Sequence, residues 1–315
     1  MFGGYSLCPC DREAKGGRLK TLLAVALTSH LLDGLSGVGA RVWREIRPVI
    51  ERGEDPVEWA GRMLSAEDAE AVRSRLERMD EFEAAVADLN SDGISAVSDF
   101  EDIYPRSWLE KLVGKHPPVL FYAGEASLLN AASIGIVGSR DVDMAGSEFA
   151  AAVAQEACRN GYAVVSGGAR GVDQIAMRAA FECGGPSLAF LSDSLLRVVR
   201  SAEMRDILES SRVCLATSFA PSAGFSVGTA MARNKLIYAH SSATVVVSSA
   251  LDSGGTWAGA VEAMSGSLCP VLVRTGDGVP NGNGALIRKG GIGLASPEGL
   301  LKAIEDSGPL QATLL

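Results

Sequence analysis

The sequence predicts an α/β protein in which a doubly wound, Rossmann-like and mostly parallel sheet follows a small all-helical domain. Two observations carry this prediction. From residue 116 on, short runs typical of β-strands alternate with helical patterns, which is the pattern of right-handed βαβ units in a parallel sheet. In the first 115 residues, apolar side chains recur at spacings of three and four, which predicts amphipathic helices.

Three segments are expected along the chain: a helical domain over 1–115, a Rossmann-like domain over 116–305 and a tail over 306–315. Helical periodicity runs from Lys20 to about Asp102. The boundary is placed at Lys115-His-Pro-Pro118, because both prolines lack a backbone donor and favour extended conformations before them.

Six strands are expected in the second domain, each followed by a helix or a turn. They are 134–137, 163–166, 187–191, 213–216, 244–247 and 269–273. Helices are expected to end near Asn160, Cys183 and Ser211, to cover Thr229 to Ala239, and to follow Trp257. Ligands of such sheets bind at the carboxyl ends of the strands, so the site is expected there.

The helical domain contains a glycine-bracketed turn, Leu35-Ser-Gly-Val-Gly-Ala40, between two helical patterns. Turns of this kind occur in helix-hairpin-helix and SAM-like modules, where backbone N–H groups can face a phosphate. The signal is weak by itself, and a tight interhelical turn explains the same glycines more simply. The sequence leaves both interpretations open.

Composition limits the classes of function. The hydrophobic fraction of 47% is sufficient for a sizeable core, and the formal charge of −9 excludes a nucleic-acid protein that relies on an overall basic surface. Any such role must use a local patch; residues 1–115 carry a net charge of −6 and the rest −3. The longest early apolar stretch, Thr21 to Leu27, is too short to span a bilayer, so a cytoplasmic location without membrane contact is expected.

The six cysteines, at positions 8, 10, 158, 183, 214 and 269, show no complete zinc-ligand spacing. Free thiols are therefore expected, with Cys8 and Cys10 in a frayed terminus. His30, His116 and His240 are far apart in the sequence and are interpreted as surface or packing residues. No nucleophile motif is present, so neither a catalytic residue, a metal nor a cofactor is predicted.

Three glycine-rich turns at strand ends are the candidate binding site. The first contains Gly138, Ser139 and Arg140; the second contains Ser166, Gly167, Arg170 and Gly171; the third contains Ser253, Gly254, Gly255 and Thr256. Glycine permits a close backbone approach to an anion, and a following helix N-terminus offers unpaired N–H groups. The arginines inside the first two turns favour anion binding over simple turn formation, whereas Asp173 fits a helix-dipole role as well as a ligand role.

Further cations, Arg233 and Lys235, flank Asn234 in a helical pattern, where a solvated face explains them as well as a binding site does. A single pocket is predicted in which Arg140, Arg170 and Arg233 converge over the strand ends.

The motifs together resemble one known family, the DNA-processing protein A family (DprA, also called Smf). The matching segments occur in the family's order over nearly the whole chain. They are Tyr104-Pro105, Pro117-Pro-Val-Leu-Phe-Tyr-Ala-Gly124, Ile136-Val-Gly-Ser-Arg140, Ser166-Gly-Gly-Ala-Arg-Gly-Val-Asp173, Arg233-Asn-Lys-Leu-Ile237, Asp252-Ser-Gly-Gly-Thr256 and Gly282-Asn-Gly-Ala-Leu-Ile-Arg-Lys-Gly290.

The resemblance implies a non-catalytic, cytoplasmic protein that binds single-stranded DNA, helps load the RecA recombinase during natural transformation and acts as a homodimer. By position, it assigns DNA contacts to Ser139, Arg140, Arg170, Arg233 and Lys235, with the glycine turns allowing close approach. The chain departs from the family at Met177, at Val199-Arg-Ser-Ala-Glu203 and at Ala230-Met231, and no C-terminal winged helix is expected.

Two other functions remain open. Ser253-Gly-Gly-Thr256 followed by Glu262 is also similar to lysine-decarboxylase-like phosphoribohydrolases, which predicts a nucleotide-binding protein or enzyme on a related Rossmann core. A degenerate family member that retains protein contacts alone is the third interpretation.

Overall fold

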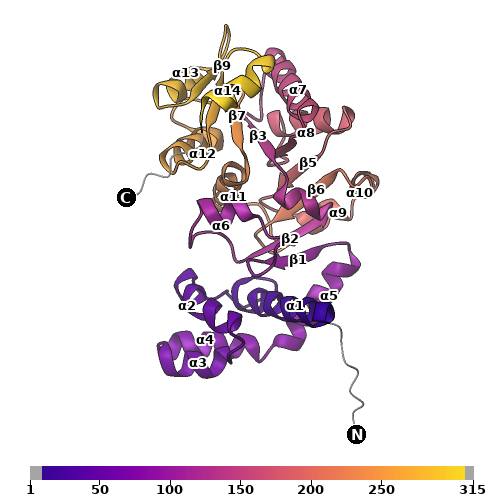
Figure 1. Ribbon diagram of the computed structural model, residues 1–315, viewed down its shortest axis with the longest axis vertical. Helices are drawn as coiled ribbons and strands as arrows, with labels where there is room; N and C mark the ends of the chain where they lie inside the picture. Colours follow the sequence, from indigo (N-terminus) through magenta and orange to yellow (C-terminus); the bar gives the residue numbers. More distant parts are fainter. Residues whose placement is uncertain (1–8, 309–315) are drawn as a thin grey trace.

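The computed structural model describes the backbone of residues 9–308 and the side chains from residue 16 onward. Five helices form one end of the molecule, and a sheet flanked by helices forms the rest (Figure 1). The helices at this end are α1 (Pro9–Thr28), α2 (Ala40–Glu51), α3 (Pro56–Met63), α4 (Ala66–Leu76) and α5 (Met79–Ser91). Cys8 and most of the expected C-terminal tail lie outside the described residues, as does the side chain of Cys10.

The sheet has nine strands in the order β1-β2-β6-β5-β4-β3-β7-β8-β9. They are β1 (Ser95–Ser98), β2 (Val119–Gly124), β3 (Ser133–Val137), β4 (Ala163–Ser166), β5 (Ser187–Phe190), β6 (Val213–Thr217), β7 (Ala243–Val246), β8 (Val271–Arg274) and β9 (Ile292–Leu294). Strands β1 and β2 are antiparallel to their neighbours, and all other pairs are parallel. The predicted doubly wound, mostly parallel sheet is thus confirmed.

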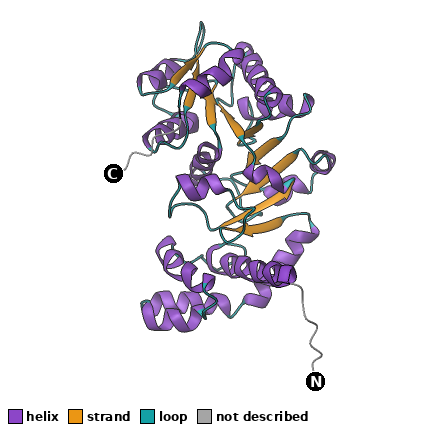
Figure 2. Cartoon of the chain, in the orientation of Figure 1, coloured by secondary structure: helices purple, strands orange, loops and turns teal. Residues whose placement is uncertain are grey.

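Helices cover both faces of the sheet (Figure 2). They are α6 (Arg106–Lys111), α7 (Met144–Arg159), α8 (Val172–Glu182), α9 (Leu195–Val199), α10 (Ala202–Glu209), α11 (Val227–His240), α12 (Gly254–Ser265), α13 (Asn281–Arg288) and α14 (Leu300–Asp306), with 3-10 turns η1 (Ala126–Asn130) and η2 (Pro297–Gly299). Successive strand residues point to opposite faces, so Ile136 packs with α7 and α8 while Val137 packs with α11 and α12. This alternation of faces creates two apolar cores, one on each side of the sheet.

Three strands were not predicted. β1 lies inside the region expected to be helical, because Gly93, at a φ of +79°, follows the end of the preceding helix and residues 95–98 then pair with β2. β2 follows Pro118 directly and lies after the predicted domain boundary, whereas β1 lies before it, so the sheet begins within the predicted helical domain. The division into domains itself stays a prediction. β9 is only three residues long, too short to give a period. The single helix expected before Ser211 is two, α9 and α10, separated by Arg200 and Ser201.

The turn between α1 and α2 is held by a buried arginine. Arg75 on α4 is 1% exposed and donates to the carbonyl oxygens of Ala26, Ser29 (2.6 Å) and Ser36 (2.8 Å). Those carbonyls lie at the end of α1 and in the turn, where intrahelical partners run out. A Cβ at Gly37 would stand 2.3 Å from the carbonyl oxygen of Thr28, so tight packing explains this glycine.

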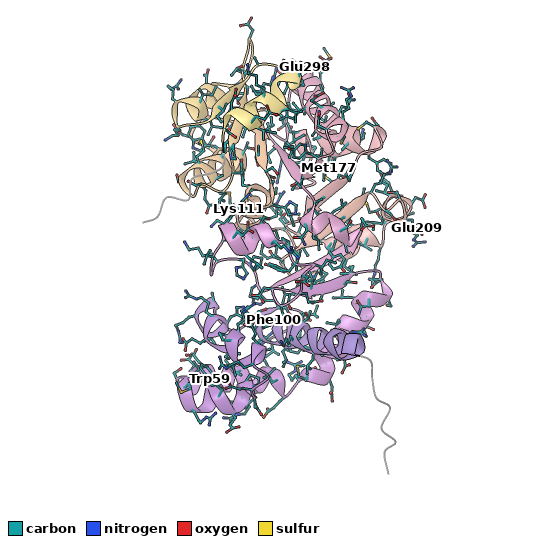
Figure 3. The ribbon with its side chains drawn as sticks, in the orientation of Figure 1. Trp59, Phe100, Lys111, Met177, Glu209 and Glu298 are labelled. Atoms are coloured by element: carbon teal, nitrogen blue, oxygen red, sulfur yellow. The ribbon has the colours of Figure 1, made fainter. Side chains whose placement is uncertain are left out.

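The helical end is joined to the sheet through Asp99, which follows β1. Its Oδ2 accepts from Arg47 Nε at 2.9 Å and lies 3.1 Å from His116 Nε2. Phe100, labelled between the two parts in Figure 3, packs edge-on against Trp43 and beneath the Arg47 guanidinium. This junction connects α2 to the start of the sheet.

Among the described residues, no group of three or more His, Cys, Asp or Glu side chains could hold a metal, and the four described cysteine side chains are free. None of the described helices is long and apolar enough to cross a membrane.

His240 is a packing residue at the end of α11. Its Nδ1 lies 2.9 Å from Ser133 Oγ and its Nε2 lies 3.0 Å from the Leu129 carbonyl. A carbonyl only accepts, so Nε2 carries the proton and Nδ1 accepts from the serine in the neutral ring. Burial lowers the pKa of His240 to about 4.

The free energy of unfolding is therefore expected to fall as the pH drops from about 6.5 toward 4. In this range His240 becomes protonated in the unfolded state but stays neutral in the folded state. At about 1.4 kcal/mol per pH unit, moving from pH 6.5 to 5 removes about 2 kcal/mol. Urea unfolding at pH 7 and pH 5 measures the change. His240→Gln should show a drop smaller by that amount, and an equal drop in both proteins would contradict the assignment.

Candidate functional site

A cavity of about 480 Å³ opens at the carboxyl ends of β3 and β7. These strands are neighbours, yet the chain leaves β3 toward β4 on one side and β7 toward β8 on the other. Such a topological switch point is where doubly wound sheets bind ligands. The walls come from the turns after β3, β4 and β7 and from α11 with its preceding loop.

The structure gathers most of the predicted binding residues in this cavity. Those that line it are Gly138, Ser139, Arg140, Arg233, Asn234, Ser253, Gly254, Gly255 and Thr256. The first and third glycine turns therefore converge as predicted from strand order. From the second turn, only Ala169 and the following Asp173 reach the cavity.

Two predicted cations do not line it. Arg170 is 71% exposed and pairs at 2.6 Å with Asp141 on the surface. Lys235 pairs at 2.5 Å with Glu262 on α12. The prediction that Arg140, Arg170 and Arg233 converge in one pocket is thus wrong for Arg170, which lies outside the cavity lining. A sequence pattern predicts where a residue lies along a helix or turn, but not the direction in which its side chain points.

Ser166 and Gly171 of the second turn do not line the cavity but hold the first turn and β3 in place. Ser166 Oγ donates to the carbonyl of Ile136 at 2.6 Å, which fixes β4 against β3. Gly171 has a φ of +85°, and a Cβ there would stand 2.4 Å from the carbonyl oxygen of Ser139. Glycine therefore permits the contact between the first two turns.

Helix N-termini at the site differ in what they offer. The N-cap of α7, Asp143, accepts from Gly146 N at 2.7 Å, so the helix after the first turn is already capped by a carboxylate. In the second turn, Gly167 N donates to Asp173 Oδ2 at 3.1 Å. The N-cap of α12, Ser253, makes no side-chain cap bond, and no acidic residue lies in that helix's first turn. The N-terminal N–H groups that lack a capping side chain are those of α12, whereas the sequence predicted open N–H groups after the first turn, at α7, as well.

Arg233 is the central charged residue of the site. It lies on α11, is 6% exposed, and its Nε and Nη1 have no hydrogen-bond partner among the described residues. The nearest carboxylate oxygen, Asp173 Oδ2, is 3.8 Å from Nη1, a contact between charges without a hydrogen bond. Because a buried guanidinium normally has its N–H groups paired, the cavity has donors to spare and lacks acceptors.

Electrostatics lead to the same conclusion. Burial lowers the pKa of Arg233, Asp173 opposes this, and the positive charge of Arg140 lowers it further. Burial also raises the pKa of Asp173, against the effect of Arg233. Two guanidinium groups and one carboxylate thus share a poorly hydrated cavity, and an anion between the guanidiniums would stabilise both.

Gly167 makes room for this arginine. A Cβ at Gly167 would stand 1.1 Å from Arg233 Nη1, so no other residue fits while the guanidinium keeps its place. On the other side, Asn234 Nδ2 donates to the carbonyl of Gly255 at 3.2 Å and ties α11 to the start of α12. Together these contacts fix the position of Arg233 before any ligand enters.

The sequence did not identify the apolar side chains at the opening. Phe225 is 54% exposed and lies 5.6 Å from the Arg140 guanidinium, and Val227 is 72% exposed. Leu251, also exposed, adjoins the cavity-lining Ala250. We call Phe225, Val227 and Leu251 the apolar rim. The glycine turns carry a sequence signal, whereas isolated apolar residues in loops carry none.

Glu262, the residue on which a phosphoribohydrolase would depend, does not line the cavity and is paired with Lys235. The carboxylate in the cavity wall is Asp173, which is held by Gly167 N and faces Arg233. The geometry therefore does not favour that enzyme.

Inorganic phosphate is expected to bind in the cavity and, at ten times its dissociation constant, to add about 1.4 kcal/mol to the unfolding free energy. Thermal denaturation with and without phosphate measures the shift. Gly167→Ala should lose most of it, because the new methyl group displaces Arg233. Gly224→Ala, whose Cβ meets no atom within 4 Å, is the matched control and should keep it. An unchanged shift in Gly167→Ala would separate anion binding from Arg233.

Fold and cavity together define a doubly wound α/β protein with a pocket at the switch point of its sheet. Comparison with protein families then gives a match over residues 96–304 to the family of DNA recombination-mediator protein A. The chain belongs to this family, as its motifs indicated.

Two curated relatives show how far the similarity extends. Protein Smf of Escherichia coli (strain K12) is 28% identical over 195 residues, which cover 60% of this chain and 52% of that protein. DNA processing protein DprA of Bacillus subtilis (strain 168) is 29% identical over 126 residues, covering 39% and 42%. The chain thus spans about half the length of the curated relatives it matches.

Two solved structures share the fold. DNA processing protein A (DprA) from Streptococcus pneumoniae has a TM-score of 0.68 at 22% identity, over 84% of this chain and 93% of that one. DNA processing protein A from Helicobacter pylori, a protein with a unique single-stranded DNA binding mode, has a TM-score of 0.57 at 22% identity, over 68% and 96%.

One departure from the family's motifs has a structural explanation. Met177, at the position where the family usually has a histidine, lies on α8 (Figure 3). It is partly buried against the apolar cluster that joins the helical end to the sheet, so packing has replaced a polar group there.

Proposed function

We propose that this protein binds single-stranded DNA in the switch-point cavity and acts, without catalysing a reaction itself, in DNA processing during natural transformation. The observation that carries the proposal is Arg233, a buried cation whose Nε and Nη1 have no partner among the described residues and which shares a cavity with a second cation. A phosphate group of the strand would supply the missing acceptors. Membership of the family supports the choice of DNA as the source of that phosphate.

The apolar rim supports a single strand over a duplex. In a duplex the bases are stacked and paired, so only phosphates and base edges are accessible. An unpaired strand can place a base against the Phe225 ring while its phosphate lies between Arg140 and Arg233. Because the Phe225 ring and the Arg140 guanidinium are close together, the base on the ring and the phosphate at Arg140 can belong to the same or adjacent nucleotides.

Because the net charge of the chain is −9, DNA binding must depend on the cavity itself and not on an extended basic surface. Affinity must then come from a few buried contacts and from stacking. RecA loading and a homodimer remain part of the proposal, and so does a cytoplasmic location. They rest on the likeness to the family alone.

Affinity for a labelled poly-thymidine oligonucleotide is expected to fall between about 50 and about 200 mM salt, because phosphate contacts release counterions. Arg140→Ala should weaken binding roughly tenfold through the loss of a charged hydrogen bond and lower the slope of log affinity against log salt by about 0.7. Fluorescence anisotropy gives both quantities.

Arg178→Ala is the matched control, since it removes one exposed cation from α8 outside the cavity. Binding that ignores both salt and Arg140→Ala, or no binding at low salt, would refute the DNA role.

Phe225→Ala is expected to weaken single-strand binding by about 1–3 kcal/mol, the usual contribution of one stacked base, and to leave any weak duplex binding unchanged. Titration with matched single-stranded and double-stranded oligonucleotides measures the difference. Met63→Ala removes a comparably exposed apolar side chain from α3 and should change neither. Equal losses for both forms of DNA would show that the ring does not contact bases.

A further inference from the structure

Part of the cavity lining is buried and holds polar groups that have no partner among the described residues. Tyr238 on α11 lines the cavity, is 1% exposed, and its hydroxyl has no hydrogen-bond partner within the described part of the chain. The Nε and Nη1 atoms of Arg233 are likewise buried and without a hydrogen-bond partner among the described residues. We call Ile237, Tyr238 and the Arg233 guanidinium the cavity floor.

These groups define the kind of ligand that fits. An unpaired buried donor costs about 1–3 kcal/mol, so several in one cavity mark a site that a ligand completes. The guanidinium only donates. Burial raises the pKa of Tyr238 well above its ordinary value, so the phenol keeps its proton and can donate as well. The matching ligand group carries several acceptor oxygens on one atom.

The floor is closed behind Tyr238. A Cβ built on Gly259 of α12 would stand 3.1 Å from the tyrosine Cε2, so α12 packs directly against the ring. Ile237 and Val137, beside it, are 1% and 8% exposed and belong to the core between α11 and the sheet. A chain entering from the rim cannot pass beyond the floor.

We propose that the cavity floor receives a terminal phosphate monoester of the DNA strand, held by Arg233 and the Tyr238 hydroxyl. The inference rests on the proposed function and deepens it. An internal phosphodiester has two free oxygens and must let the chain leave on both sides, which the closed floor prevents. A terminal monoester has three free oxygens, a single ester link and a charge between −1.5 and −2 at pH 7, about twice that of a diester.

The charges of the cavity agree with this choice. Arg140 and Arg233 contribute two positive charges, and Asp173, whose own pKa is raised by burial, offsets at most one of them. The second negative charge of a monoester is better compensated at the floor, next to Arg233, than at the exposed rim.

The test compares four internally labelled poly-thymidine ligands: linear strands with a 5′-phosphate, with a 3′-phosphate or with two hydroxyl ends, and a circular strand. The wild-type protein should bind one phosphorylated linear strand about tenfold or more tightly than the hydroxyl-ended and circular strands. Whichever end is preferred is the one that enters the cavity. Thymidine monophosphate, which has the same terminal phosphate, should compete only at far higher concentration than the oligonucleotide.

Tyr238→Phe removes the hydroxyl and leaves the ring. It should reduce the preference for a phosphorylated end to about twofold, without weakening the binding of hydroxyl-ended strands. The free variant should be as stable as the wild type or more so in urea, because an unpaired buried hydroxyl is gone. Tyr162→Phe is the control. Tyr162 is partly buried and directly precedes β4, so it lies at the amino ends of the strands, away from the cavity, and this variant should keep the full preference for a phosphorylated end.

The outcomes separate the two proposals. Equal affinity for circular, hydroxyl-ended and phosphorylated strands would overturn the terminal-phosphate inference and leave single-strand binding intact. A phosphate preference that persists in Tyr238→Phe would overturn the role of the cavity floor. Competition by thymidine monophosphate at the same concentration as the oligonucleotide would assign the site to a free nucleotide, and failure of every strand to bind would refute the proposed function as well.

Discussion

The burial of the Arg233 guanidinium is the constraint on which the rest of the site depends. A cation taken out of water is tolerated only where neighbours compensate it, and here Asp173 does so at 3.8 Å without a hydrogen bond. The position of Asp173 in turn depends on Gly167, whose N–H it accepts and whose missing side chain leaves space for the arginine. One charged pair thus explains the residue types of the second turn, which itself contributes little to the cavity wall.

The same constraint divides the predicted residues into two groups. Those of the first and third turns face the cavity, whereas those of the second turn support it from behind. The glycines of the three turns make room for different neighbours: Gly138 for Val172, Gly171 for the backbone of the first turn, and Gly255 for Asn234. A glycine-rich motif alone does not distinguish these roles.

Much of the fold could be predicted from the sequence, because the strands β3 to β8 are continuous apolar runs that alternate with helices. β1 and β2 could not, since their pairing is antiparallel and depends on residues far apart, such as Ser95 opposite Tyr122. At the site, the positions of Arg140 and Arg233 followed from the motifs. The outward direction of Arg170 and the pairing of Lys235 with Glu262 depend on neighbours from other elements, which no local pattern encodes.

The helical end of the molecule also covers one edge of the sheet. β1, one edge of the sheet, lies against α1 and α5, and Thr21 of α1 is hydrogen-bonded to Ser98. β9, the other edge, has no strand on its outer side within residues 9–308. Addition of a further strand to this sheet would therefore have to occur beside β9. Edge-to-edge pairing of two copies would therefore close on itself as a two-fold pair, and growth into a fibre through strand addition is blocked by the helices at the opposite edge.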